Sequence, residues 1–219
     1  ALAKRLPELE NVNFSGGILM WVPEIFQIDD PAAHMTWNSW HMGGIERKAI
    51  AQGFSFYSPI RYSELPRYYR DSSDPVDVAV FQVTPMDEHG YFSLGLAADY
   101  TMAAVSRARV VVLEVNPNVP FANGECHVHI SQVSAIVESQ EPVPEVGLPK
   151  IGPVQEAIGK YVADMIPDGA TLQIGYGAIP DAVVMQLTHK RDLGIHTEML
   201  GDGILTLIEA GAVTNRLKN

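Results

Sequence analysis

Two continuous apolar runs constrain the fold of this chain more than any other feature of its sequence. Residues 76–83 and 110–115 are short, rich in β-branched side chains and bounded by turn-forming residues. Such runs are typical of parallel strands that are buried on both faces of a sheet. Residues 100–108, between them, have the pattern of a helix. The strand, helix, strand order predicts an α/β fold with an open parallel sheet covered on both faces.

The remainder of the chain is divided by a segment that lacks periodicity. Residues 138–149 are rich in proline and acidic residues, which predicts an extended linker. We therefore place one domain at residues 1–149 and a second at residues 150–219. Residues 38–75 show little periodicity and predict short strands joined by long loops.

The second domain begins with a clear alternation of elements. Residues 154–166 place apolar side chains on one face of an amphipathic helix. A strand is predicted at 170–174, then a tight loop at 175–177 and a helix with Pro180 in its first turn, where proline is tolerated. A second strand is predicted at 194–199, before a last helix. Parallel neighbouring strands are the expected result.

Composition excludes several classes of function. The formal charge is −11, from 26 acidic and 15 basic residues, and no run of lysine or arginine offers a surface for nucleic acid or an anionic membrane. The single cysteine, Cys126, cannot form an internal disulfide and fits a reducing, cytoplasmic environment. No apolar run reaches the roughly 20 residues that span a bilayer. The missing initiator methionine and the helix-like start of the chain lead us to expect a fragment of a longer protein.

Two features are expected at one edge of the second sheet. Ligands of open parallel sheets bind beyond the carboxyl ends of the strands. The loop Gly175-Tyr176-Gly177 would present backbone amides there, close to a helix N-terminus that suits a phosphate or an oxyanion. Glu198 falls near the end of the neighbouring strand. Taken alone, however, the loop is better explained as a structural glycine turn, and Glu198 is better explained as a solvated charge.

A third pattern, His127-Val128-His129, places two imidazoles on one face of a strand, a spacing that can bind zinc or iron. No third ligand completes such a site in the sequence. We therefore predict a hydrogen-bonding or surface role for the two histidines and no metal. Asp202, beside a glycine turn, is predicted to cap the last helix.

Longer motifs indicate a family. The stretches GATLQIGYGAIPDAVVMQL and LGIHTEMLGDGILTLIEAG closely resemble the acetyl-CoA hydrolase/transferase family, which includes the 4-hydroxybutyrate CoA-transferases. Upstream, MDEHGYFSLGLAADYT, VVLEVNPNVP, HVHIS and LPKIG follow the pattern and order of that family. The resemblance covers essentially the whole chain.

The resemblance implies a role for each residue at the predicted edge. Glu198 matches the catalytic glutamate of the family. The wall of the site, which binds substrate or CoA or holds an oxyanion, would be formed by Gln173, Gly175, Tyr176, Gly177 and Ala178. The family lacks a metal or redox cofactor, and coenzyme A is a substrate. Its members are longer than this chain, with an N-terminal active-site histidine and a C-terminal glycine-rich segment for CoA that are absent here.

The resemblance also implies an architecture and partners. Two similar CoA-transferase-type open parallel-sheet domains are expected, the second only partly present. Residues 1–149 would be most of the N-terminal domain plus the linker, and residues 150–219 the start of the C-terminal domain. The expected partners are acyl-CoA, short carboxylic acids and the remainder of the polypeptide or a partner chain, within a cytoplasmic homodimer.

Three functions stay open at this point, beside the less favoured metal-dependent hydrolase that His127 and His129 would suggest. A CoA-transferase would move CoA between a short-chain acyl-CoA and an acid such as acetate, butyrate or 4-hydroxybutyrate, through an anhydride and then a CoA thioester on Glu198. An acyl-CoA hydrolase would let water take the acyl group instead. A non-catalytic CoA-binding module would use the glycine loop and tolerate the loss of Glu198.

Overall fold

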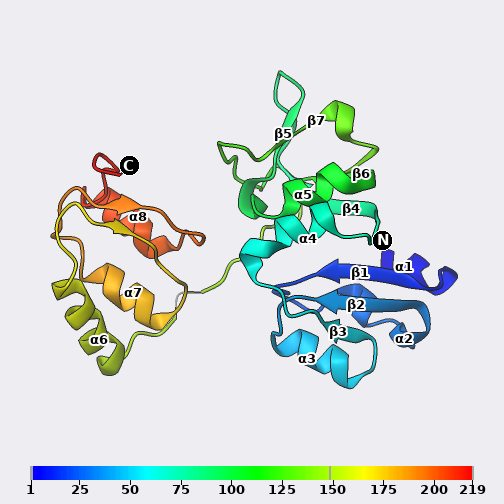
Figure 1. Cartoon of the computed structure of the whole chain (residues 1–219), viewed down its shortest axis with the longest axis horizontal. Helices are drawn as coiled ribbons and strands as arrows, with labels where there is room; N and C mark the ends of the chain where they lie inside the picture. Colours follow the sequence, from blue (N-terminus) through cyan, green and yellow to red (C-terminus); the bar gives the residue numbers. More distant parts are fainter. Residues whose placement is uncertain (1, 148, 219) are drawn as a thin grey trace. The chain divides into compact units, whose positions relative to one another are not determined.

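The computed structural model describes residues 2–147 and 149–218, so Leu148 of the predicted linker and the two terminal residues lie outside the described part. The chain divides into two compact units, Ala1–Pro144 and Glu145–Asn219 (Figure 1). Both units are α/β with parallel sheets, as predicted. Their assignment to two CoA-transferase-type domains stays a prediction. In the described ranges, no helix has the length and apolar character required to traverse a bilayer.

The first unit opens with a three-stranded parallel sheet, β1-β2-β3. Its elements in chain order are α1 (Leu2–Arg5), η1 (Leu6–Glu8), β1 (Val12–Gly16), η2 (Glu24–Phe26), α2 (Pro31–His34), β2 (Met35–Ser39), α3 (Gly44–Ala51) and β3 (Ser55–Tyr57). Trp37 of β2 packs in its core with Phe26 and Phe54. Trp40, just beyond β2, is buried in a neighbouring cluster that contains Leu65 and several tyrosine side chains.

A second parallel sheet, β4-β6-β8, and an antiparallel pair, β5-β7, complete the first unit. The elements are η3 (Tyr62–Glu64), α4 (Leu65–Asp71), β4 (Val76–Val83), β5 (Tyr91–Ser93), η4 (Gly95–Ala97), α5 (Thr101–Arg107), β6 (Ala108–Val115), β7 (His127–His129), η5 (Ile130–Gln132) and β8 (Ala135–Glu138). The order β4, α5, β6 confirms the predicted strand, helix, strand unit.

Helices occur where the sequence predicted only strands and loops. Within residues 38–75 the structure contains α3 and α4, so that prediction is wrong for these segments. Both helices have only about two turns, and each buries just two side chains, Glu46 and Ala49 in α3 and Leu65 and Tyr69 in α4. A helix with so few buried positions shows no clear helical repeat of apolar residues in its sequence. Its stability comes from tertiary packing instead.

In the described residues, the sheet β4-β6-β8 is fully covered on one face and only partly covered on the other. Val83, Val111 and Leu113 point into a core with Phe92. On the opposite face Val78 is 55% exposed and Val80 is 63% exposed. The predicted covering of both faces is therefore wrong for this sheet in the described residues. The continuous valine runs reflect the β propensity of a branched side chain as well as its burial.

The second unit is built from three helices around a short parallel pair of strands. Its elements are α6 (Pro153–Asp164), β9 (Thr171–Leu172), α7 (Ala178–Met185), β10 (Gly194–Ile195) and α8 (Asp202–Glu209). Ala163, Val184, Leu187, Leu193 and Leu207 form most of its core. Helices α6 and α7 lie side by side (Figure 1). Gly159 sits at their contact, where an added Cβ would lie 2.6 Å from the carbonyl oxygen of Ala182.

Gly159→Ala is therefore expected to destabilise the second unit. Alanine normally favours a helix over glycine by about 1 kcal/mol, but here the new methyl group meets the backbone of α7, and overpacking of this kind costs about 1–3 kcal/mol. Gly44→Ala in α3 is the matched control, because nothing lies within 4 Å of its added Cβ. Denaturant unfolding of both variants checks the expectation. Equal stability of the two would contradict it.

Candidate functional site

The two strands of the second unit end at one edge. They pair in parallel, with Gly194 beside Thr171 and Ile195 beside Leu172. The carboxyl ends of parallel strands point in the same direction. The loop after β9 therefore leaves the sheet at this edge, and so does the segment after β10, which carries Glu198. The ladder contains only two registered pairs, so both strands are shorter than the predicted 170–174 and 194–199.

A side chain connects the two segments beyond the ladder. The Thr197 hydroxyl donates to the carbonyl oxygen of Ile174 at 2.8 Å and accepts from the amide N–H of Ile174 at 3.1 Å. Ile174 is the residue before Gly175, and Thr197 is the residue before Glu198. The bridge therefore joins the start of the glycine loop to the segment that carries the predicted nucleophile.

The glycine loop leads directly into helix α7. Gly177 is the N-cap residue and has φ of 132°, a backbone conformation that favours glycine. Gly175 does not have this backbone conformation, and there is room for a side chain at its position, since an added Cβ would meet only Pro180 at 3.8 Å, an ordinary contact. Pro180 lies in the first turn of α7, as predicted. The helix N-terminus consequently places its partial positive charge at the end of the loop.

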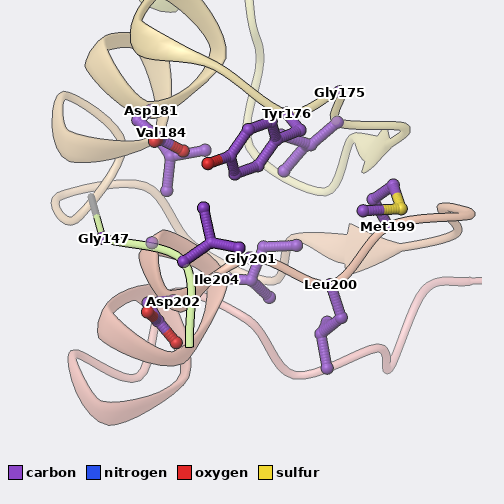
Figure 2. A pocket seen from close by; sticks show the side chains of 13 residues that line it. Gly147, Gly175, Tyr176, Asp181, Val184, Met199, Leu200, Gly201, Asp202 and Ile204 are labelled. Atoms are coloured by element: carbon purple, nitrogen blue, oxygen red, sulfur yellow. The ribbon is translucent and has the colours of Figure 1, made fainter. Parts of the chain in front are cut away.

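A cavity of about 220 Å³ opens beside this loop. Its lining side chains are drawn in Figure 2. The side chains of Tyr176, Asp181, Met199 and Leu200 surround it in that view. The complete lining is Val146, Gly147, Ile174, Gly175, Tyr176, Asp181, Val184, Met199, Leu200, Gly201, Asp202, Gly203 and Ile204. Most of these groups are apolar, so the cavity could accept a small organic group with few charges.

The residues predicted for the site are only partly gathered around this cavity. Gly175 and Tyr176 line it, whereas Gln173, Gly177, Ala178 and Glu198 are absent from its lining. Glu198 is exposed beside Met199, which does line the cavity. Gln173 is exposed as well. Their roles stay predictions.

Two carboxylates of the lining were not predicted to contribute to a site. Burial, and then the negative charge of Asp202, raise the pKa of the Asp181 carboxyl above its ordinary value. Asp181 belongs to the first turn of α7, a position that sequence patterns identify only as favourable for an acid near a helix N-terminus. Asp202 is the first residue of α8, and Gly201 is the N-cap, with no side-chain cap hydrogen bond. The predicted capping role of Asp202 is therefore wrong.

The two histidines of the first unit form local hydrogen bonds. The Nδ1 atom of His127 lies 2.9 Å from the carbonyl oxygen of Gly124. In His129 the Nδ1 atom lies 2.8 Å from the Ser131 hydroxyl, and the side chain caps η5. These contacts agree with the predicted hydrogen-bonding role. Among the residues that the structure describes, no group of three or more His, Cys, Asp or Glu could hold a metal ion.

Comparison with known proteins identifies the family. Residues 21–147, more than half of the chain, match the model of the acetyl-CoA hydrolase/transferase N-terminal domain. The chain belongs to the acetyl-CoA hydrolase/transferase family.

Individual relatives are similar over most or all of the chain. A butyryl-CoA:acetate CoA-transferase of Anaerostipes caccae is 52% identical over 100% of this chain and 50% of its own length. A 4-hydroxybutyrate coenzyme A transferase of Clostridium kluyveri is 43% identical over 84% of this chain and 43% of its own. The crystal structure of RipA from Yersinia pestis matches with a TM-score of 0.91 and 33% identity, covering 99% of this chain and 52% of that one. This chain thus spans about half the length of these relatives.

Proposed function

We propose that the full-length protein is a CoA-transferase that moves CoA between a short-chain acyl-CoA and a carboxylic acid, with Glu198 as the nucleophile. The main support is the position of Glu198, one residue beyond the Thr197 bridge and at the same sheet edge as the glycine loop. The names of the relatives support the same class of reaction, since they are CoA-transferases. Their greater length supports the view that polypeptide beyond these residues completes the site.

The chemistry follows from a carboxylate at that position. Glu198 attacks the thioester carbonyl carbon, CoA leaves as a thiolate, and an acyl-glutamyl anhydride forms. The thiolate then attacks the glutamyl carbonyl, which releases the first carboxylate and leaves a glutamyl-CoA thioester. A second carboxylate reverses these steps. Thioester and anhydride exchange without any change of oxidation state, so the proposal includes no cofactor.

The glycine loop would stabilise the charge that develops during each attack. Amides of residues 175–177 are the proposed oxyanion donors, supported by the α7 N-terminus that follows them. Gln173 and Ala178 would form the flanks of the same wall. The apolar lining of the cavity, with Met199 and Leu200, supports an acyl group of a few carbon atoms.

Acceptor dependence tests this proposal. The full-length enzyme would be incubated with acetyl-CoA, butyryl-CoA or 4-hydroxybutyryl-CoA, with and without a carboxylic acid acceptor. A transferase forms the new acyl-CoA only when acceptor is present, and it releases little free CoA without it. Equal release of free CoA in both conditions would establish a hydrolase instead. Binding of CoA without either reaction would leave only the non-catalytic module.

A homodimer in solution is a further expectation, which rests on the family resemblance.

A further inference from the structure

Beyond the carboxyl ends of β9 and β10, one hydroxyl group bridges the two segments that follow. His196 donates its amide N–H to Leu172 at 2.9 Å, the last main-chain hydrogen bond between the two segments before the bridge. Two residues beyond the end of β9, the hydroxyl of Thr197 satisfies both the amide and the carbonyl of Ile174. A side chain therefore takes the place of the next main-chain rung of the ladder.

That hydroxyl lies between the two segments whose separation matters for catalysis. On one side Ile174 leads into the glycine loop, and on the other Thr197 leads into Glu198. The hydrogen bonds of the bridged pair restrain the points from which Gly175 and Glu198 leave the sheet. Threonine is also stiff at χ1, because it is branched at Cβ. A bridge made by such a side chain fixes both the spacing and the direction of the segments that leave it.

We propose that Thr197 is a positioning residue, whose hydroxyl sets the distance between the Glu198 carboxylate and the amides of the Gly175–Gly177 loop. This inference rests on the proposed function of Glu198. It concerns the rate at which Glu198 reacts, not the identity of the nucleophile. A displacement of about 1 Å at a reacting group lowers rates by about 100-fold.

Three substitutions separate the hydroxyl from the shape of the side chain. Thr197→Val keeps the branched shape and removes the hydrogen bonds, whereas Thr197→Ser keeps the hydroxyl. Thr197→Ala removes the hydroxyl without placing a second methyl group against Ile174, which covers the case in which valine prevents folding. Thr214→Val is the matched control, because the Thr214 hydroxyl bonds to Asp192 in the same unit at 3.1 Å and has no place in the proposed site.

The readouts are steady-state kinetics of the full-length enzyme, the single-turnover rate of CoA adduct formation on Glu198, and the melting temperature. For Thr197→Val and Thr197→Ala we expect kcat and the adduct rate to fall together by about 10–100-fold, while KM for acyl-CoA changes much less. Thr197→Ser should restore most of the rate, and Thr214→Val should retain it. The adduct should still form on Glu198 in every variant.

Several outcomes would overturn the inference. Folded Thr197→Val enzyme with a normal adduct rate would do so, and so would a Thr197→Ser enzyme as slow as Thr197→Val. An equal loss in Thr197→Val and Thr214→Val would reduce the bridge to a purely structural role. Failure of the proposed function is recognised separately, because the wild-type enzyme would then form no adduct on Glu198.

Discussion

Glu198→Gln is expected to abolish both CoA transfer and the covalent CoA adduct in the full-length enzyme. An amide neither attacks a thioester nor leaves as a carboxylate does, so the loss should amount to several orders of magnitude in kcat. The fold should survive, because Glu198 is exposed and the change conserves its size. Incubation with acyl-CoA and no acceptor, reduction with borohydride and peptide mass spectrometry would locate the adduct in the wild-type enzyme.

Two further variants define that result. Glu209→Gln, at the exposed end of α8, is the matched control and should retain wild-type transfer. Glu198→Asp should fail nearly as badly as Glu198→Gln, since the shorter side chain withdraws the nucleophile by about 1 Å. Near-normal transfer by Glu198→Gln, or an adduct on another residue, would discard the mechanism and leave Glu198 as a solvated charge.

Leu113→Ala should cause a large loss of stability in the first unit. Leu113 is 0% exposed and lies in β6, the central strand of β4-β6-β8. It packs with Val83 and Phe92. Removing a buried leucine side chain costs about 2–5 kcal/mol, because lost burial adds to the cavity that remains. Urea unfolding of the variant and wild type gives the difference in free energy.

Val80→Ala on the neighbouring strand is the matched control for that measurement. Val80 is 63% exposed, so its truncation should change the free energy of unfolding by no more than about 0.5 kcal/mol. A similar loss for Val80→Ala and Leu113→Ala would mean that the face of the sheet carrying Val80 is covered in solution. A negligible loss for Leu113→Ala would contradict the assignment of this core.

The elements with strong local signals could be predicted from the sequence. Strand β4 has the predicted bounds, residues 76–83, and α5 follows the predicted helix closely. β6 begins two residues before the predicted position and ends where expected. A run of β-branched residues, or a helix between two such runs, is predicted correctly because the burial pattern and the intrinsic propensity favour the same secondary structure there.

The ends of β9 and β10 could not be predicted in the same way. Residues 170–174 and 194–199 have the composition of strands, yet the ladder stops after two pairs and a threonine side chain continues it. A hydrogen bond from one hydroxyl group produces no repeating pattern in the sequence from which it could be predicted. The cavity could not be predicted from the sequence either, because Asp181 and Asp202 are brought near each other only by the packing of α7 and α8. Tertiary contacts, not local pattern, determine such features.

The tryptophans provide a spectroscopic consequence of the two-unit architecture. All three, Trp21, Trp37 and Trp40, belong to the first unit, and Trp37 and Trp40 are buried there. Indole fluorescence therefore reports the unfolding of the first unit alone, whereas far-ultraviolet circular dichroism also records α6, α7 and α8. Coincident transitions by the two probes indicate that the units unfold together, and separated transitions give each unit its own midpoint.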